Sequence, residues 1–197
     1  LLDTQSLFTH FYQRFASFIF KAEVAAEHIE QHEDGITLQL AGQTLHCRQL
    51  VLAAGNGNGE LPTGAMQQRQ LQMVMLEDAA LPAIYAHFIG RSSKPLLTIT
   101  SHTKASSTVW YMGGDLAENG VGLTPAALIQ QAQMLLQKLL PRLELSPQHR
   151  FKTLDISRAE PQQSSLLRPD DAHVVKTNNI ISGWPTKLAL APRFAEK

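Results

Sequence analysis

The sequence predicts an α+β fold, and three patterns in its 197 residues support this prediction. Short apolar runs separated by polar turns recur between residues 71 and 112, which is typical of one antiparallel sheet. The strongest helical pattern of the chain follows them, over residues 124 to 140. A smaller antiparallel meander precedes them, over residues 36 to 47. We therefore expect an antiparallel or mixed sheet covered by one long helix.

Composition and charge exclude several classes of partner. The 17 Lys and Arg residues balance the 17 Asp and Glu residues, so the surface offers no overall attraction for nucleic acid or an anionic membrane. No apolar run reaches transmembrane length, and no signal peptide is evident. Cys47 is the single cysteine, which excludes an intrachain disulfide and favours a reducing compartment. No Cys/His cluster has zinc-ligand spacing, so we expect a soluble, cytoplasmic protein without a metal site.

The first part of the chain predicts one helix followed by short strands. Apolar residues from Leu7 to Phe18 recur at helical spacing, and Asp3 or Thr4 is placed to accept hydrogen bonds from the first-turn amides. The predicted helix therefore covers residues 4–16. A strand is expected after it, over residues 19–24. A meander then follows, with a turn at Asp34-Gly35, a strand of alternating apolar and polar residues over 36–40, a turn at Ala41-Gly42 and a strand over 45–47. The next expected strand covers residues 50–54.

The stretch "LVLAAGNGNGELP", residues 50 to 62, raises the possibility of a phosphate-binding loop. A dinucleotide-binding turn needs G-x-G-x-x-G at the start of a helix. Here the glycines run G-x-G-x-G, and Pro62 and Gly64 disfavour a helix just beyond. The pattern predicts a strand that leads into an irregular loop, and a plain surface turn is the alternative interpretation.

The second half of the chain contains the sheet and its covering helix. Thr124 is placed as a capping residue and Pro125 occupies the first helical position. The expected strands cover residues 71–76, 84–89, 96–100, 108–112, 151–156 and 174–182, and a last short helix starts near Pro185.

Several segments together resemble the D-amino-acid-oxidase-like family of FAD-dependent oxidoreductases, which includes glycine oxidase and flavin-linked glycerol-3-phosphate dehydrogenase. "LLDTQSLF" before a helix, the D-G meander and "QLVLAAGNGN" are similar to the middle of these proteins. The later segments "RQLQMVML", "WYMGGDLAENG" and "NNIISGWPTKLALAP" follow in the family's order. The resemblance covers nearly the whole chain.

The resemblance implies two domains and a set of residues near the cofactor. It divides the chain into part of an FAD-binding domain, 1–66 and 178–197, and a substrate-binding domain, 67–177. The segment at 183–188 would bring a helix N-terminus, whose dipole favours negative charge, to the flavin. The residues implied to lie near FAD are Val24, Ala53, Ala54, Gly55, Gly183, Thr186, Lys187 and Leu188.

The chain departs from the family where the pyrophosphate is normally held. The strand, G-x-G-x-x-G turn and helix of the first nucleotide-binding motif are not found in these residues. The chain also begins at Leu1 without methionine, so we expect either a fragment of a longer protein or a chain that has lost its cofactor site. In both cases we expect weak FAD binding by this chain alone and self-association through the exposed surface of the FAD domain.

The candidate substrate contacts are Arg69, Arg158 and Tyr111. Arg69 matches a position where the family often has arginine, and a solvated arginine at a strand start is the alternative. Arg158 or Arg168 could bind a substrate carboxylate, and an ion pair with Glu160 or Asp170 is the alternative.

Other polar and apolar side chains have simpler interpretations. Adjacent strand residues Trp110 and Tyr111 face opposite sides, so one is expected in the core and the other could line a pocket. His102 is interpreted as a surface histidine, and Cys47 as unreactive. Met73 and Met75 share a strand face and are expected to fill the core.

No G-x-S-x-G elbow or H-E-x-x-H motif is present, which agrees with chemistry performed by a flavin. The resemblance thus implies part of an oxidoreductase that transfers hydride from a small amine, amino acid or hydroxy substrate to FAD. A non-catalytic binding or interaction module derived from the same fold is the alternative.

Overall fold

The computed structural model describes residues 3–61, 66–92, 94–145, 149–162 and 171–197. The chain divides into two compact units. Unit 1 contains residues 1–66 and 161–197, and unit 2 contains residues 67–160. Residues 161–177, which the resemblance assigned to the substrate-binding part, therefore group with unit 1. The assignment of the two units to FAD and to substrate stays a prediction. None of the described helices is long and apolar enough to cross a membrane.

Unit 1 begins with the helix α1, Thr4–Arg14, which confirms the predicted helix and its cap. Asp3 is the N-cap, and its carboxylate accepts hydrogen bonds from the amides of Gln5 and Ser6 at 3.0 and 3.2 Å. The hydrogen bond from the Ser6 hydroxyl, at 2.6 Å, is the main reason why the pKa of Asp3 lies below its ordinary value. One turn of 3₁₀ helix, Ala16–Phe18, follows α1.

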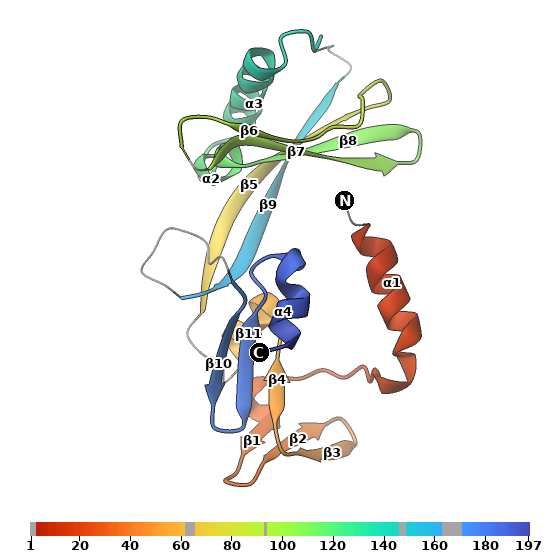
Figure 1. Ribbon diagram of the computed structural model, residues 1–197, viewed down its shortest axis with the longest axis vertical. Helices are drawn as coiled ribbons and strands as arrows, with labels where there is room; N and C mark the ends of the chain where they lie inside the picture. The colour runs from red at the N-terminus through yellow and green to blue at the C-terminus, as the bar shows by residue number, and fades with distance from the viewer. Residues whose placement is uncertain (1–2, 62–65, 93, 146–148, 163–170) are drawn as a thin grey trace. The chain divides into compact units, whose positions relative to one another are not determined.

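The predicted strand over residues 19–24 is wrong. The chain between the 3₁₀ turns Ala16–Phe18 and Ala26–His28 has no regular secondary structure, as the trace after α1 in Figure 1 shows. A strand exists only when its amides pair with a neighbour, and no described strand pairs with this segment. Apolar composition alone therefore did not decide the conformation here.

The meander forms a three-stranded antiparallel sheet in the order β1-β2-β3. The strands are β1, Ile29–Gln31, β2, Ile36–Leu40, and β3, Gln43–Cys47. Gly42 has a φ of 78°, which suits a glycine in the tight turn between β2 and β3. A side chain at Gly35 would collide with the carbonyl of Cys47, 2.6 Å from the Cβ position. Both predicted turns therefore depend on their glycines.

A second sheet of unit 1 joins distant parts of the chain in the order β10-β11-β4 (Figure 1). The strand β4, Leu50–Leu52, pairs in parallel with β11, Ile180–Trp184. The predicted single strand over 174–182 is a hairpin of β10, His173–Thr177, and β11. Its turn includes Asn178, whose φ of 52° is one that asparagine adopts more readily than most residues. The chain ends with the 3₁₀ turn Leu188–Leu190 and the helix α4, Ala191–Ala195.

Unit 2 is built on a five-stranded sheet in the order β6-β7-β8-β5-β9. Antiparallel pairing joins β5 to β8, β8 to β7 and β7 to β6, which confirms the predicted sheet. The strands β5 and β9 run side by side in Figure 1. The strand bounds are β5 Met66–Asp78, β6 Tyr85–Ile89, β7 Pro95–Lys104, β8 Ser107–Gly113 and β9 Arg150–Pro161.

Helices α2, Asp115–Asn119, and α3, Pro125–Leu139, supply the other side of the core. Thr124 caps α3, because its hydroxyl accepts a hydrogen bond from the amide of Ala127 at 3.3 Å. The buried stripe of α3 packs with the apolar face of the sheet in one cluster, as predicted. Fully buried members of this cluster are Val74, Leu76, Leu97, Trp110, Met112, Leu128, Ala132 and Leu136.

The prediction that Met73 and Met75 fill this core is wrong. Val74 and Leu76 are the β5 residues with no exposed surface, and strand alternation places the two methionines on the opposite face. Both methionines are partly buried. Trp110 and Tyr111 likewise point to opposite faces of the sheet. Trp110 is buried in the core, and its Nε1 donates a hydrogen bond to the carbonyl of Pro82 at 2.8 Å, whereas Tyr111 is only partly buried.

We predict that Leu136→Ala destabilises unit 2 by about 2–5 kcal/mol, since it removes a fully buried side chain and leaves a cavity. Met134→Ala on the same helix is the matched control, because Met134 is 56% exposed, and it should change stability by about 0.5 kcal/mol or less. Urea unfolding of both variants measures the difference. Equal losses of stability in the two variants would show that the buried face of α3, which contains Leu128, Ala132 and Leu136, does not form the core contact.

Candidate functional sites

The first candidate site lies where β4 ends. The sequence predicts an irregular loop there, but residues Gly55–Glu60 form a short 3₁₀ helix. Gly55 has a φ of 60°, a conformation that favours glycine, and apart from its two chain neighbours no described residue has an atom within 4 Å of the position that a Cβ would occupy. Ala53 and Ala54, which precede it, are exposed. Backbone with open space beside it is the property expected of a segment that a cofactor approaches closely.

Asn58 ties this turn to the neighbouring strand. Its side chain is fully buried, and its Oδ1 accepts a hydrogen bond from the amide of Ala54 at 2.9 Å. Its Nδ2 donates to the carbonyls of Leu52 and Gly183, each at 3.4 Å. The family resemblance predicts that Leu50 to Ala54 and Ile180 to Ser182 lie near each other with Gly55 and Gly183 facing one cleft. The proximity is confirmed, because Leu50 to Leu52 pair with Ile180 to Ser182. That Gly55 and Gly183 face one cleft stays a prediction.

Asn58 was not among the sequence-predicted site residues. The signal that could have found it is an asparagine within a glycine-rich turn after a strand, because such side chains often hydrogen-bond local backbone groups. Its third partner, the carbonyl of Gly183, lies 125 residues away and could not be read from that local signal.

Gly183 is glycine for a packing reason. A methyl group at this position would overlap the aromatic ring of Phe194, which comes from α4. The resemblance implies that Gly183 lies near FAD, and the described contact at this position is with the protein's own side chain. Trp184, the next residue, is 2% exposed, and its buried Nε1 has no hydrogen-bond partner among the described residues.

The residues that follow Gly183 form a constrained turn, and the short helix predicted to start near Pro185 begins later, with the 3₁₀ turn at Leu188 and α4 at Ala191. Thr186 is buried with a φ of 59°, and its hydroxyl donates to the carbonyl of Asp171 at 3.3 Å. Lys187 and Leu188 are exposed. The helix α4 begins at Ala191 and has five residues, so its dipole lends little support to the expected role of this segment.

Asp171 forms ion pairs with two residues that follow this turn. Its carboxylate lies 2.6 Å from Nζ of Lys197 and 2.9 Å from Nε of Arg193. The hydrogen bond from Lys197 is the largest cause of a pKa below the ordinary value for Asp171. Val24, the remaining predicted cofactor contact, is 44% exposed, and no described contact joins it to the turn at Gly55.

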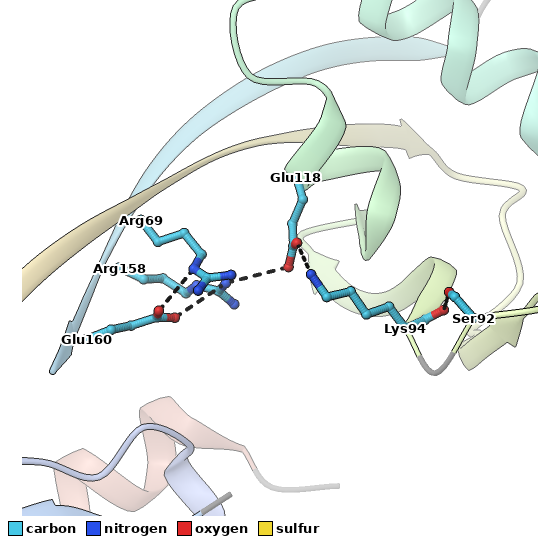
Figure 2. A network of polar contacts seen from close by, with 6 residues as sticks. All are labelled: Arg69, Ser92, Lys94, Glu118, Arg158 and Glu160. Atoms are coloured by element: carbon cyan, nitrogen blue, oxygen red, sulfur yellow. Dashed lines mark hydrogen bonds and ion pairs between the residues drawn. The ribbon is translucent and has the colours of Figure 1, made fainter. Parts of the chain in front are cut away.

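The second candidate site is a network of charges in unit 2 (Figure 2). Glu160 on β9 is its centre, because its side chain is only 2% exposed. Its Oε2 accepts a hydrogen bond from Nε of Arg69 on β5 at 3.0 Å. Arg158 lies on the same face of β9, with its guanidinium 3.6 Å from Oε1 of Glu160. The two arginines thus share one buried carboxylate as their countercharge.

Glu118 of α2 extends the network outward. It lies 3.8 Å from the guanidinium of Arg158, and Nζ of Lys94 donates to it at 2.7 Å. Burial raises the pKa of Glu118, but the hydrogen bond from Lys94 and the charges of Lys94, Arg69 and Arg158 lower it below the ordinary value overall. The five charges alternate in sign from Arg69 through Glu160, Arg158 and Glu118 to Lys94, as Figure 2 shows.

This arrangement bears on the two arginines predicted to bind substrate. The ion-pair alternative for Arg158 is what the structure shows, with Glu160 as its partner. Arg69 is paired with the same carboxylate, so it is not the solvated arginine of the alternative interpretation. Nε of Arg158 and Oε1 of Glu160 are nevertheless buried without a hydrogen bond among the described residues. Their role toward a substrate stays a prediction, and Arg168 and Asp170 lie outside the described residues.

Tyr111 lies on the sheet face opposite the helices. Its ring makes an edge contact with His102, with ring centroids 4.8 Å apart. His102 is exposed, as the sequence suggested. In the described part of the chain, no three His, Cys, Asp or Glu side chains are placed to hold a metal ion.

Comparison with known proteins identifies a homologue. No protein-family model matches the chain. Over 185 residues the chain is 44% identical to the probable FAD-dependent oxidoreductase PA4991 of Pseudomonas aeruginosa, covering 88% of this chain and 47% of that protein. The crystal structure of the FAD-dependent oxidoreductase PA4991 matches with a TM-score of 0.77 and 41% identity, over 94% of this chain and 54% of that chain. The chain is therefore a homologue of this FAD-dependent oxidoreductase and spans about half of its length.

We predict that Asn58→Ala destabilises unit 1 by about 1–3 kcal/mol, because the amide of Ala54 and the two carbonyls lose their buried partner. Asn56→Ala in the same turn is the control, since Asn56 is exposed, and its loss should be smaller. Chemical unfolding followed by hydrogen exchange of the backbone amides of unit 1 measures both losses separately from unit 2. Equal losses for both variants would contradict the proposed role of Asn58.

We predict that Glu160→Gln costs about 3 kcal/mol of stability at neutral pH, because two partly buried arginines lose their shared countercharge. Glu118→Gln is the comparison variant and should cost about 1 kcal/mol or less, since Glu118 is more exposed. Urea midpoints of both variants measure the two losses. A cost for Glu160→Gln no greater than that for Glu118→Gln would contradict the central position of Glu160.

The loss in Glu118→Gln should also depend on pH. Because folding lowers the pKa of Glu118, its stabilisation is fully present above the unfolded pKa, about 4.3, and is lost as the pH falls through the lowered folded pKa. The variant and the parent chain should therefore converge in stability in acid. A difference that stays constant down to the acid end would contradict this sign.

Proposed function

We propose that this chain forms about half of an FAD-dependent oxidoreductase, in which unit 2 faces the substrate and unit 1 contributes part of the FAD site. The observation that carries the proposal is the 44% identity to a probable FAD-dependent oxidoreductase over 88% of the chain. The structural match over 94% of the chain supports it. The finer assignment, to the D-amino-acid-oxidase-like group, rests on the resemblance of the sequence motifs.

The turn after β4 is the part of the chain that best fits a cofactor. Gly55 combines a positive φ with open space at its Cβ position, and Asn58 fixes the turn from the buried side. We expect Ala53, Ala54 and Gly55 to offer backbone to FAD, because no side chain longer than a methyl group intervenes. When bound, FAD supplies the acceptor for hydride, and the residues of this chain bind and orient the reactants.

The proposed substrate is a small amine, amino acid or hydroxy compound. Tyr111 is the candidate contact on the open face of the sheet, where its ring is held by His102. Arg69 and Arg158 are candidates for an acidic group of the substrate, because the network of two arginines and one lysine against two glutamates carries one net positive charge. Both arginines are already paired, so an acidic substrate would have to compete with Glu160 and Glu118.

Tight binding of FAD needs groups beyond those in this chain. The pyrophosphate is normally bound by the amides of a G-x-G-x-x-G turn and the helix that follows, and the 197 residues contain no such motif. Several charge-assisted hydrogen bonds of about 1.5–3 kcal/mol each are therefore missing from the chain's own contribution. Binding to the chain alone should be weaker by several orders of magnitude.

We predict that the purified chain is colourless, whereas a longer form that also carries a dinucleotide-binding motif is yellow and holds stoichiometric FAD. The visible absorbance of flavin measures both. With the longer form, reduction of the bound flavin under anaerobic conditions by a panel of amines, amino acids and hydroxy acids tests the reaction. Stoichiometric FAD on the chain alone would contradict the proposed division of the cofactor site.

Failure of every member of the panel to reduce a bound flavin would instead favour the non-catalytic module. The panel should pair each acidic compound with its neutral amide. If the charged network receives an acidic group, the acid should reduce the flavin faster than the amide, and Glu118→Gln should change that preference. An equal rate for each pair would remove the arginines from substrate binding.

A further inference from the structure

A pocket opens in unit 2 at the C-terminal end of α3, on the helix side of the sheet. Its volume is about 460 Å³, which lies within the roughly 300–1,000 Å³ of typical small-molecule sites. We call it the α3 pocket. Its lining residues come from the turn before β6, from β8, and from the end of α3 and the residues after it. They are Pro82, Ile84, Trp110, Leu139, Leu140, Pro141, Arg142 and Leu143.

The walls of the α3 pocket are an outward continuation of the core. Ile84, Leu139, Leu140 and Leu143 pack against the core cluster of unit 2, yet each is only partly buried. The described side chains therefore leave apolar surface open to solvent inside a concave site. Transfer of an apolar group from water onto such walls is favourable, so they suit the apolar body of a ligand.

Trp110 lies at the base of the α3 pocket. It has no exposed surface, and its Nε1 already donates a hydrogen bond to the carbonyl of Pro82 at 2.8 Å. The base therefore offers no free polar donor from the indole. Because Pro82 both lines the pocket and accepts this hydrogen bond, a ligand that contacts Pro82 changes the surroundings of the indole proton.

The polar character of the α3 pocket comes from its rim. Among the described residues that line it, Arg142 is the single charged one, and its side chain is exposed. The C-terminus of α3 carries a partial negative charge of about half a unit, which the full positive charge of Arg142 outweighs. Lys138 in the last turn of α3 adds to the positive side. The rim therefore favours an anionic group on the ligand.

We propose that the α3 pocket binds a small amphipathic acid. Its aromatic or aliphatic body packs against the apolar walls, and its carboxylate pairs with the guanidinium of Arg142. An arginine suits this role, because its planar fork of donors matches a carboxylate. Trp110 and Tyr111 point to opposite faces of the sheet, so this site is separate from the substrate contact proposed at Tyr111. The inference does not depend on the proposed function.

The first experiment is an NMR titration of the ¹⁵N-labelled chain with 4-phenylbutyrate. The indole signals of Trp110 and Trp184 give one reporter in each unit. We expect a saturable shift of the Trp110 signal and no shift of the Trp184 signal. Phenylacetate, which is two methylene groups shorter, should bind more weakly, by up to about fourfold for each group removed. Ile84→Ala removes part of a wall and should weaken binding of 4-phenylbutyrate at least twofold.

A second titration tests the charge with 4-phenylbutanamide, the neutral amide of the same acid. The parent chain should bind the acid about fivefold more tightly than the amide, because the carboxylate forms charge-assisted hydrogen bonds. Arg142→Gln should remove this preference, and its fold should survive because Arg142 is exposed. Arg91→Gln is the matched control, since Arg91 is an exposed arginine of unit 2 outside the α3 pocket, and it should keep the preference.

Four results would overturn the proposal. The first is no saturable shift of the Trp110 signal up to about 10 mM ligand, a concentration that would detect even millimolar affinity. The second is an equal shift of both indole signals, which indicates non-specific binding. The third is an acid that binds no more tightly than its amide, or a preference that survives in Arg142→Gln. The fourth is a Trp110 signal that moves when the ligand-free chain is diluted, because a second copy of the chain would then occupy the pocket.

Discussion

The parallel pairing of β4 with β11 is the contact on which the architecture depends. It joins Leu50 to Ile180 across most of the chain, so unit 1 must be made from both ends of the sequence. Unit 2 is then an insertion between two adjacent strands, and the chain enters it along β5 and leaves along β9, which are neighbours in one sheet. Asn58 reinforces the pairing from the side, since its amide bridges the turn after β4 and the backbone of β11.

The two units differ in the source of their stability. Unit 2 has a continuous core in which a sheet face packs against α3, and the hydrophobic effect is its main stabilising contribution. In unit 1, the described core is small, and it is accompanied by the buried hydrogen bonds of Asn58 and the more exposed ion pairs of Asp171. The helix α1 shows the same difference, because none of its residues is buried.

The charged network has a structural role that follows from the burial of its central carboxylate. Glu160 is buried, so it must be compensated, and Arg69 and Arg158 converge on it from neighbouring strands. Removing Glu160 would leave the two arginines without their shared countercharge in a partly desolvated place, whereas Glu118 and Lys94 at the other end of the network are more exposed. The residual hydrogen-bonding capacity of Arg158 and Glu160 lies inside this network rather than at its surface.

The sequence by itself determined the local elements whose signals are contained within a few residues. The capped helices α1 and α3, the meander and the strands of unit 2 all follow from periodicity, capping residues and turn residues. Only the tertiary structure decided the features that depend on a partner far away in the chain. Residues 19–24 lack a neighbouring strand and stay irregular, and Gly183 is glycine because of Phe194. Glu160 became the centre of a network only when β5 and β9 met, because a side chain's charge is visible in a sequence, whereas its burial and its partners are set by packing.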